Sequence, residues 1–151
     1  MTSRVHPGET PASYAIKGSI EFLLNETDPL AAILRNLFVF KIVPMINPDG
    51  VSRGHFRTDG FGKNLNRYYR DANPVEQPAV FAICQLINYF ELDKRIFFFC
   101  DYHAHGSYKN HFFYGNSLGF LMQVESRAFA RLFELNNPSF SYDCCDFSQR
   151  Q

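Results

Sequence analysis

The sequence predicts an α/β fold in which helices flank a mixed, largely parallel sheet. Two apolar runs without polar alternation, LFVFKIVPM at residues 37–45 and RIFFFCDYHAH at residues 95–105, are typical of strands buried on both faces of a parallel sheet. A shorter strand is predicted at residues 111–115. Segments with helical periodicity lie between and around these runs. Strands that alternate with helices favour this layered architecture.

Four segments are predicted to be helical, at residues 11–24, 30–36, 76–90 and 118–135. The first should begin after Thr10 as N-cap, with Pro11 at the first helical position, where its missing N–H costs nothing. NPDG at residues 47–50 predicts a turn. Val51–Ala72 should form a long polar loop, and loops of this length are often functional. An irregular tail is expected over residues 136–151.

The composition is that of one globular domain and excludes several classes of function. The chain has 151 residues, of which 46% are hydrophobic and 20% charged, and its formal net charge is zero, so nothing favours a nucleic acid or a membrane as partner. The longest apolar run, IFFFC, is too short to span a bilayer. The spacing of the four cysteines predicts neither a disulfide framework nor a zinc knuckle, which favours a reducing compartment.

A candidate metal site combines a short N-terminal motif with the end of the second predicted strand. Catalytic zinc commonly takes three imidazole or carboxylate ligands and keeps a fourth position for water. His6, Glu9 and His103 supply that set, and the intervening Pro-Gly allows a tight turn. Asp101 lies two residues before His103, on the same strand face, where it could accept a hydrogen bond from a ligating imidazole.

The polar loop supplies groups that bind anions. Arg57 and Arg67 carry forked guanidinium groups that suit a carboxylate or an oxyanion, and Asn66 offers an amide beside Arg67. A zinc-bound water together with a carboxylate-binding arginine describes an exopeptidase that recognises a chain end.

Each residue also has a plainer interpretation. The H-x-x-E pair alone is weak evidence, because such a pair is more often two polar residues in a tight turn than a metal site. His103 alone could be a hydrogen-bonded residue at a strand end. The basic residues Arg53, Lys63 and Arg70 are most simply solvated charges, although one of them could bind an acidic substrate side chain. The joint pattern, rather than any one residue, carries the metal-site hypothesis.

Four motifs in order carry a family resemblance. They are HPGETPAS, FKIVPMINPDGV, GHFRTDGFGKNLNR and CDYHAHGSYKNHFFYGN. Together they resemble the cytosolic carboxypeptidases, a branch of the zinc metallocarboxypeptidases that removes glutamates from polyglutamylated tubulin. The form of the third motif most resembles the type-five member, which removes branch-point glutamates. The resemblance implies a zinc-carboxypeptidase-like sheet, a cytoplasmic location with access to microtubules, and glutamylated protein tails as partners.

The resemblance also implies roles for individual residues. One zinc ion would be held by His6, Glu9 and His103. Arg57 resembles the arginine that stabilises the oxyanion of the tetrahedral intermediate. Asn66 and Arg67 resemble the pair that grips the terminal carboxylate of the substrate.

The chain departs from the family pattern in three places. Asn64 stands where classical digestive carboxypeptidases have an aspartate bonded to the first zinc histidine. The general-base glutamate of the family lies on a strand beyond the second histidine motif, and Glu125 and Glu134 do not match that motif. Only five residues precede His6. We therefore expect residues 1–151 to be a partial catalytic domain without the N-terminal β domain, the first strands and the general-base segment.

Three functional hypotheses remain open from the sequence. The first is a zinc carboxypeptidase that removes C-terminal or branch-point glutamates from polyglutamylated proteins such as tubulin. The second is a zinc acylase that acts on small N-acyl amino acids. The third is a non-catalytic module that binds glutamylated tails through Arg57, Asn66 and Arg67.

Overall fold

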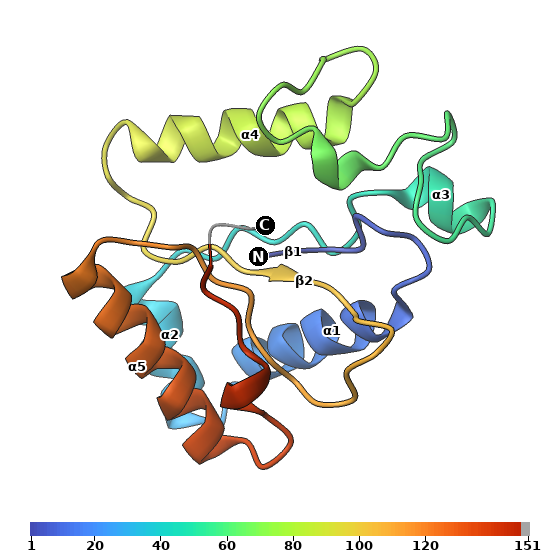
Figure 1. Cartoon of the computed structure of the whole chain (residues 1–151). Coiled ribbons are helices and arrows are strands. Elements are labelled where there is room, and N and C mark those ends of the chain that lie inside the picture. Colours follow the sequence, from blue (N-terminus) through green and yellow to red (C-terminus); the bar gives the residue numbers. More distant parts are fainter. Residues whose placement is uncertain (149–151) are drawn as a thin grey trace. The chain divides into compact units, whose positions relative to one another are not determined.

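The computed structural model describes residues 1–148 and divides the chain into two compact units (Figure 1). The first unit is Met1–Ala104, and the second begins at His105. Every residue of the predicted site lies in the first unit. The last three residues of the predicted irregular tail, 149–151, lie outside the described residues.

A short parallel ladder forms the centre of the first unit. Strand β1 (Thr2–Ser3) pairs in parallel with β2 (Asp101–Tyr102), and the register places Thr2 opposite Asp101. Val43 adds a further parallel bridge to Thr2, so three segments far apart in the sequence lie side by side (Figure 1). This pairing and the flanking helices confirm the predicted α/β class with parallel strands.

The predicted strands are much shorter than their apolar composition indicated. Within residues 37–45 only Val43 makes a bridge, and within residues 95–105 only Asp101–Tyr102 is a strand. The side chains of Phe97, Phe98 and Phe99 are 80%, 57% and 46% exposed, so the prediction of a buried strand there is wrong. Apolar composition shows what a segment can bury, but a strand also needs neighbours on its edges and a layer on each face.

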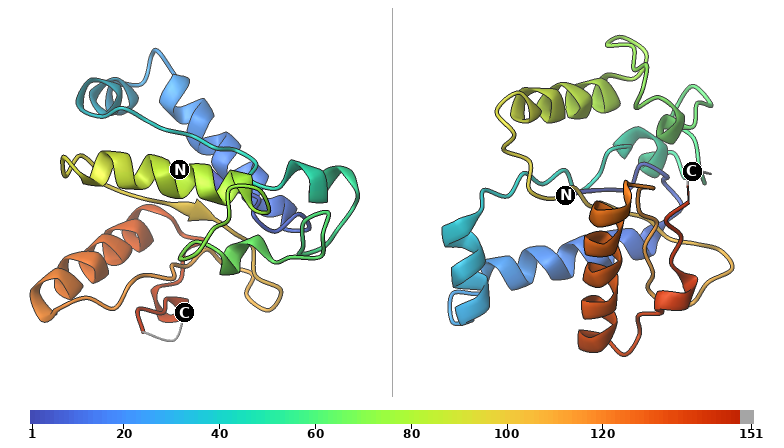
Figure 2. Two further views of the ribbon diagram at one scale, coloured as in Figure 1. Left: turned by 90° about the horizontal axis from the view of Figure 1, so that it is seen from above. Right: turned by 60° about the vertical axis from the view of Figure 1, so that its left-hand side comes forward.

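Helices α1 (Thr10–Leu24) and α2 (Pro29–Leu37) follow β1 and contact each other (Figure 2). Asp28 caps α2 by accepting hydrogen bonds from two backbone amides of its first turn. The N-cap of α1 is Glu9 and makes no capping bond, so the prediction of Thr10 as N-cap is wrong. The reason is that the Glu9 carboxylate turns away from the helix toward two histidines.

The segment between the ladder strands contains three more helical elements. Residues 47–50, predicted as a turn, lead into the short helix α3 (Pro48–Ser52), whose N-cap Asn47 accepts from the amide of Gly50. The predicted polar loop is interrupted by the 3₁₀ turn η1 (Leu65–Arg67), and α4 spans Pro78–Glu91. Among the described residues, no helix is long and apolar enough to cross a membrane.

The hydrophobic core of the first unit lies directly behind the predicted site. It consists of Val5, Ile46, Leu65, Val80 and Ile83. Val5 precedes His6 in the chain, and Leu65 follows Asn64. Burial of these two apolar neighbours therefore fixes the backbone from which the polar side chains of the site project.

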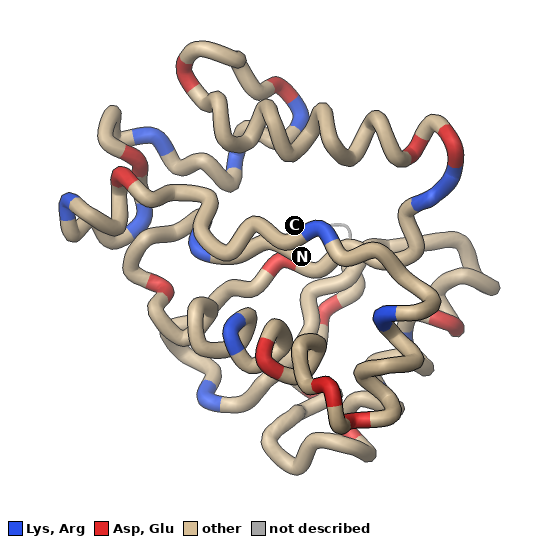
Figure 3. The backbone as a smooth tube through the Cα atoms, turned by 180° about the vertical axis from the view of Figure 1, so that it is seen from behind, with Lys and Arg blue, Asp and Glu red and all other residues tan. Residues whose placement is uncertain are grey.

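The second unit is built on α5 (Phe120–Asn136) and the 3₁₀ turn η2 (Tyr142–Cys144). Its aromatic cluster joins Phe113 to Phe129, Phe133 and Phe140 at ring-centroid distances of 4.7–5.7 Å. The strand predicted at residues 111–115 is reduced to isolated bridges at His111 and Tyr114. Acidic and basic positions are interspersed along the chain (Figure 3).

Candidate metal centre

The turn that carries His6 and Glu9 is held by backbone contacts with the loop after α3. The amide of Gly8 donates to the carbonyl of Phe56 over 2.7 Å. A Cβ at position 8 would lie 2.6 Å from Cδ2 and 2.8 Å from the carbonyl oxygen of Phe56, both closer than real contacts allow. The absence of a side chain at Gly8 therefore permits this approach, which brings the Arg57 loop next to the turn.

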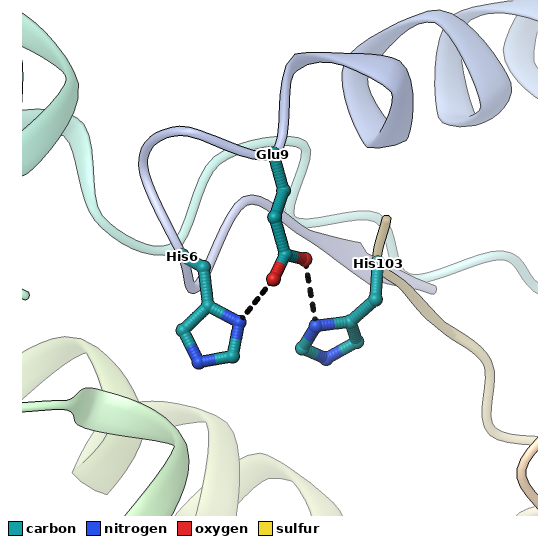
Figure 4. Close-up of side chains that lie close together, drawn as sticks. All are labelled: His6, Glu9 and His103. Carbon is teal, nitrogen blue, oxygen red and sulfur yellow. Dashed lines mark hydrogen bonds and ion pairs between the residues drawn. The ribbon is translucent and has the colours of Figure 1, made fainter. Parts of the chain in front are cut away.

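The side chains of His6, Glu9 and His103 converge on one point (Figure 4). Glu9 Oε1 lies 2.8 Å from His6 Nδ1, and Glu9 Oε2 lies 3.0 Å from His103 Nδ1. One ligand atom from each residue lies within 4.8 Å of the other two. Glu9 Oε2 also accepts from the amide of Ala104 over 2.9 Å, which fixes the carboxylate between the two rings.

The far nitrogen of each imidazole faces an acceptor. His6 Nε2 lies 3.1 Å from Asn64 Oδ1, and His103 Nε2 lies 2.8 Å from Asp101 Oδ2. When each ring is neutral, an N–H at Nε2 can donate to its acceptor, and the lone pair of Nδ1 is then directed toward the common point, where a cation can use it. Metal-ligating histidines characteristically have such outer partners.

The surroundings of Glu9 and His103 shift the pKa values of these two residues strongly. Burial by itself raises the pKa of Glu9, but His103, His6 and the Ala104 amide outweigh it and hold the pKa well below its usual range. Burial lowers the pKa of His103, while hydrogen bonds to Asp101 and Glu9 raise it further, to about 9. Without a cation, His103 is therefore an imidazolium between two carboxylates.

The cluster has the donor set and the polarity that a divalent cation requires. His6 is only 2% exposed, and its Nδ1 has no partner in hydrogen-bonding geometry even though Glu9 Oε1 lies 2.8 Å away. A buried nitrogen lone pair that faces a carboxylate is unfavourable unless a positive charge lies between them. Two imidazoles and one carboxylate, with one side of the site exposed at His103, match an open zinc site.

Of the predicted anion-binding residues, Arg57 contacts the cluster directly and Asn66 is linked to it through Asn64. Arg57 Nη1 is 3.5 Å from Glu9 Oε1, and its side chain is 47% exposed. Asn66 and Arg67 lie on η1, where the Asn66 amide donates to Asn64 Oδ1 over 3.1 Å. Asn64 therefore binds the His6 ring and the start of the Asn66–Arg67 pair through one oxygen. The Arg67 guanidinium donates to the carbonyl of Asn66, and its side chain is exposed.

Two further residues, which no sequence motif predicted, support the cluster. Thr2 is 3% exposed and donates from Oγ1 to Asp101 Oδ1 over 2.6 Å. Arg4 is 7% exposed, and its guanidinium binds the carbonyl of Pro7 and the hydroxyl of Ser13. Neither belongs to a metal-binding pattern, and only the pairing of β1 with β2 would have pointed to Thr2.

A family comparison accounts for this arrangement. The family model described as zinc carboxypeptidase matches residues 1–141. The chain belongs to the zinc carboxypeptidase family. The family is one of metallopeptidases, which agrees with the pair of histidines and the glutamate that the fold brings together.

Individual relatives of this zinc carboxypeptidase chain are similar over parts of their length. Cytosolic carboxypeptidase 6 of Homo sapiens is 40% identical over 152 residues, which cover 99% of this chain and 30% of the human protein. Cytosolic carboxypeptidase-like protein 5 of Danio rerio is 48% identical over 96 residues, or 64% of this chain and 11% of that protein. The chain thus spans less than a third of the length of either relative.

Solved structures of the family share the fold. A metallo-carboxypeptidase from Burkholderia cenocepacia is similar with a TM-score of 0.87 and 28% identity, over 99% of this chain and 40% of that one. A putative carboxypeptidase A from Shewanella denitrificans gives a TM-score of 0.82 and 29% identity, over 93% of this chain and 37% of the other.

Proposed function

We propose that this chain is part of a zinc-dependent carboxypeptidase that removes C-terminal or branch-point glutamates from glutamylated proteins such as tubulin. Its similarity to proteins named cytosolic carboxypeptidases supports a carboxypeptidase activity and a cytosolic location. The glutamylated substrate and the access to microtubules rest on the resemblance that the four sequence motifs carry. The basic residues of the polar loop, Arg53, Lys63 and Arg70, are candidates for binding the side chain of the substrate glutamate. We expect neither nucleic acid nor membrane as partner.

The observation that carries the proposal is the position of Glu9 between two imidazoles whose far nitrogens are both occupied. In this arrangement Nδ1 of His6, Nδ1 of His103 and one oxygen of Glu9 would hold the ion. A bound zinc ion supplies a Lewis acid that polarises a peptide carbonyl and lowers the pKa of a water molecule.

The other residues bind and orient the substrate. Arg57 lies beside Glu9 with half of its side chain exposed, so its guanidinium can donate to an oxyanion that forms next to the ligand cluster. Asn66 and Arg67 would hold the terminal carboxylate through an amide and a forked guanidinium.

Zinc content tests the ligand assignment directly. The purified 151-residue chain should bind one zinc ion per molecule, and His6→Ala should lose it because a buried ligand is removed. His111→Ala is the matched control, because His111 lies in the second unit, where it contacts Asn137. Equal metal content in wild type and His6→Ala would contradict the assignment.

Product analysis separates the carboxypeptidase from the acylase. The chain is incubated with a peptide that ends in consecutive glutamates and, separately, with an N-acyl amino acid. The proposal predicts zinc-dependent release of free glutamate that is slow, because no glutamate among the described residues matches the family's general base. Arg67→Gln should reduce this release strongly, because the terminal carboxylate loses its guanidinium partner. Release of an acyl group without glutamate release would favour the acylase.

A non-catalytic binding module is the second candidate function. The carboxylates of Glu9 and Asp101 are both bound to the imidazole of His103, so neither is free to act as a general base. Glu134, in the second unit, accepts from the Tyr142 amide and pairs with Arg131, so its pKa is lowered and it makes a poor general base. This candidate predicts saturable binding of the glutamate peptide and no glutamate release, even in single-turnover assays with excess enzyme.

A further inference from the structure

Arg4 has three features that are unusual together. Its side chain is 7% exposed, its backbone has a φ of +56°, and it lies two residues before the proposed ligand His6. A left-handed backbone is unfavourable for any residue with a Cβ. Burial of a charged guanidinium is also unfavourable. A residue that combines both is held there by specific interactions.

The guanidinium of Arg4 binds two neutral oxygens rather than a carboxylate. Nη1 donates to Ser13 Oγ over 2.7 Å, and Nη2 donates to the carbonyl of Pro7 over 2.5 Å. Among residues 1–148 no ion pair involves Arg4, so charge neutralisation does not explain its position.

One acceptor lies inside the ligand turn, and the other lies in the helix that follows it. Pro7 stands between His6 and Glu9, and Ser13 lies in the first turn of α1. The turn closes with the Glu9 amide donating to the His6 carbonyl and the Thr10 amide to the Gly8 carbonyl. Binding the Pro7 carbonyl fixes the peptide unit at the centre of this turn. It therefore fixes the directions in which His6 and Glu9 project.

We propose that Arg4 is a positioning residue that holds the His6–Glu9 turn in its metal-binding conformation. This inference rests on the proposed zinc site. The planar fork of arginine reaches both oxygens at once, whereas the single ammonium of lysine offers no such fixed geometry. The backbone of Arg4 is held as well, because its carbonyl accepts from the amide of Asn47 over 3.1 Å.

Two variants at this position distinguish the contribution of the guanidinium fork to zinc binding from the contributions of the positive charge and of the backbone conformation. Arg4→Lys keeps the charge and loses the fork, and Arg4→Gly relieves the positive φ and removes the side chain. Arg35→Lys is the matched control, because Arg35 also donates to two backbone carbonyls, those of Leu23 and Asn25, at the other end of α1. All variants are made in the full 151-residue chain, and circular dichroism checks that they fold.

Two measurements test the proposal. Competition with a chromophoric chelator gives the zinc affinity, and the visible spectrum of the cobalt-substituted protein reports the ligand geometry. We expect both Arg4 variants to bind zinc about 10- to 100-fold more weakly, the usual effect of losing an outer support of a metal site. Their cobalt spectra should change because the ligand geometry relaxes. Arg35→Lys should leave affinity and spectrum unchanged.

The opposite results overturn the inference in distinguishable ways. If the wild type binds zinc and both folded Arg4 variants bind it equally well, Arg4 is not a positioning residue. If Arg4→Gly alone binds like the wild type, the backbone rather than the guanidinium matters, which also rejects the proposal. If the wild type itself binds no zinc, the proposed function fails and this inference fails with it.

Ser13→Ala keeps the test decisive if the Arg4 variants do not fold. This change removes one acceptor and leaves the buried guanidinium bound to the Pro7 carbonyl. Weaker zinc binding by Ser13→Ala supports the proposal, and unchanged affinity with an unchanged cobalt spectrum rejects it.

Discussion

Zinc binding should release a proton from His103. In the metal-free protein, burial lowers the pKa of His103, but the hydrogen bonds to Asp101 and Glu9 raise it to about 9. The ring is therefore protonated at pH 6.5, and zinc can use Nδ1 only after that proton leaves. One proton displaced per ion corresponds to an apparent affinity that rises about tenfold per pH unit. Since the side chain is 32% exposed, solvent screening reduces the release to roughly 0.5–1 proton.

Calorimetry in buffers of different ionisation enthalpy measures this number. A zinc-bound water with a pKa of about 7 is roughly one-quarter ionised at pH 6.5, so it adds only about 0.2 proton to the release. Asp101→Asn removes the larger of the two interactions that raise the pKa of His103, and it should release fewer protons and flatten the pH dependence. Asp93→Asn, which breaks an exposed pair with Arg95, is the control and should behave as wild type. No release from wild type, or equal release from Asp101→Asn, would refute the reasoning.

Three further predictions concern the supports of the site. Gly8→Ala should lower the free energy of unfolding by about 1–3 kcal/mol, because the added Cβ would lie 2.8 Å from the carbonyl of Phe56; Gly18→Ala, with open space around it, is the control in a urea titration. Thr2→Val should weaken zinc binding about tenfold because Asp101 loses its donor, whereas Thr2→Ser should retain affinity; equal affinities would exclude the role of the hydroxyl. The metal-free protein should lose stability as the pH rises through about 9, because the protonated His103 stabilises the fold fully only below its unfolded pKa of about 6.5. Thermal melting at several pH values should show a smaller loss for Asp101→Asn than for the wild type, and equal losses would contradict this prediction.

The sequence predicts the helices well because their signals are local. The first helix was predicted at 11–24 and is found at Thr10–Leu24, and the third was predicted at 76–90 and is found at Pro78–Glu91. Prolines at the first helical positions and a change of periodicity mark these bounds within the sequence itself. The N-cap of α1 was misplaced because the Glu9 side chain interacts with residues 94 positions away in the chain.

The strands could not be predicted with similar accuracy because strand pairing is not local. The runs at 37–45 and 95–105 are apolar enough to be buried, yet only Val43 and Asp101–Tyr102 pair with β1.

The residues of the candidate site also differ in whether the sequence shows their role locally. His6, Glu9, His103 and Asp101 were predicted because their spacing or their place at a strand end is visible in the sequence. The contributions of Thr2 and Arg4 were not visible, because a buried threonine and a buried arginine form no pattern of their own. Their importance depends on which atoms face them: a carboxylate 99 positions away for Thr2, and a carbonyl inside the ligand turn for Arg4.

The short ladder between β1 and β2 is therefore more important for the site than its size suggests. Its register sets Thr2 opposite Asp101, and the alternation of side chains places His103 on the same face as Asp101. A slip of one residue would bring Tyr102 opposite Thr2 and turn the interacting side chains to opposite faces. Asp101 would then lose its donor, and the outer support of His103 would be lost with it. Two further contacts join the site to the turn that follows β1, namely the hydrogen bond from the Gly8 amide to Phe56 and the contact between His6 and Asn64.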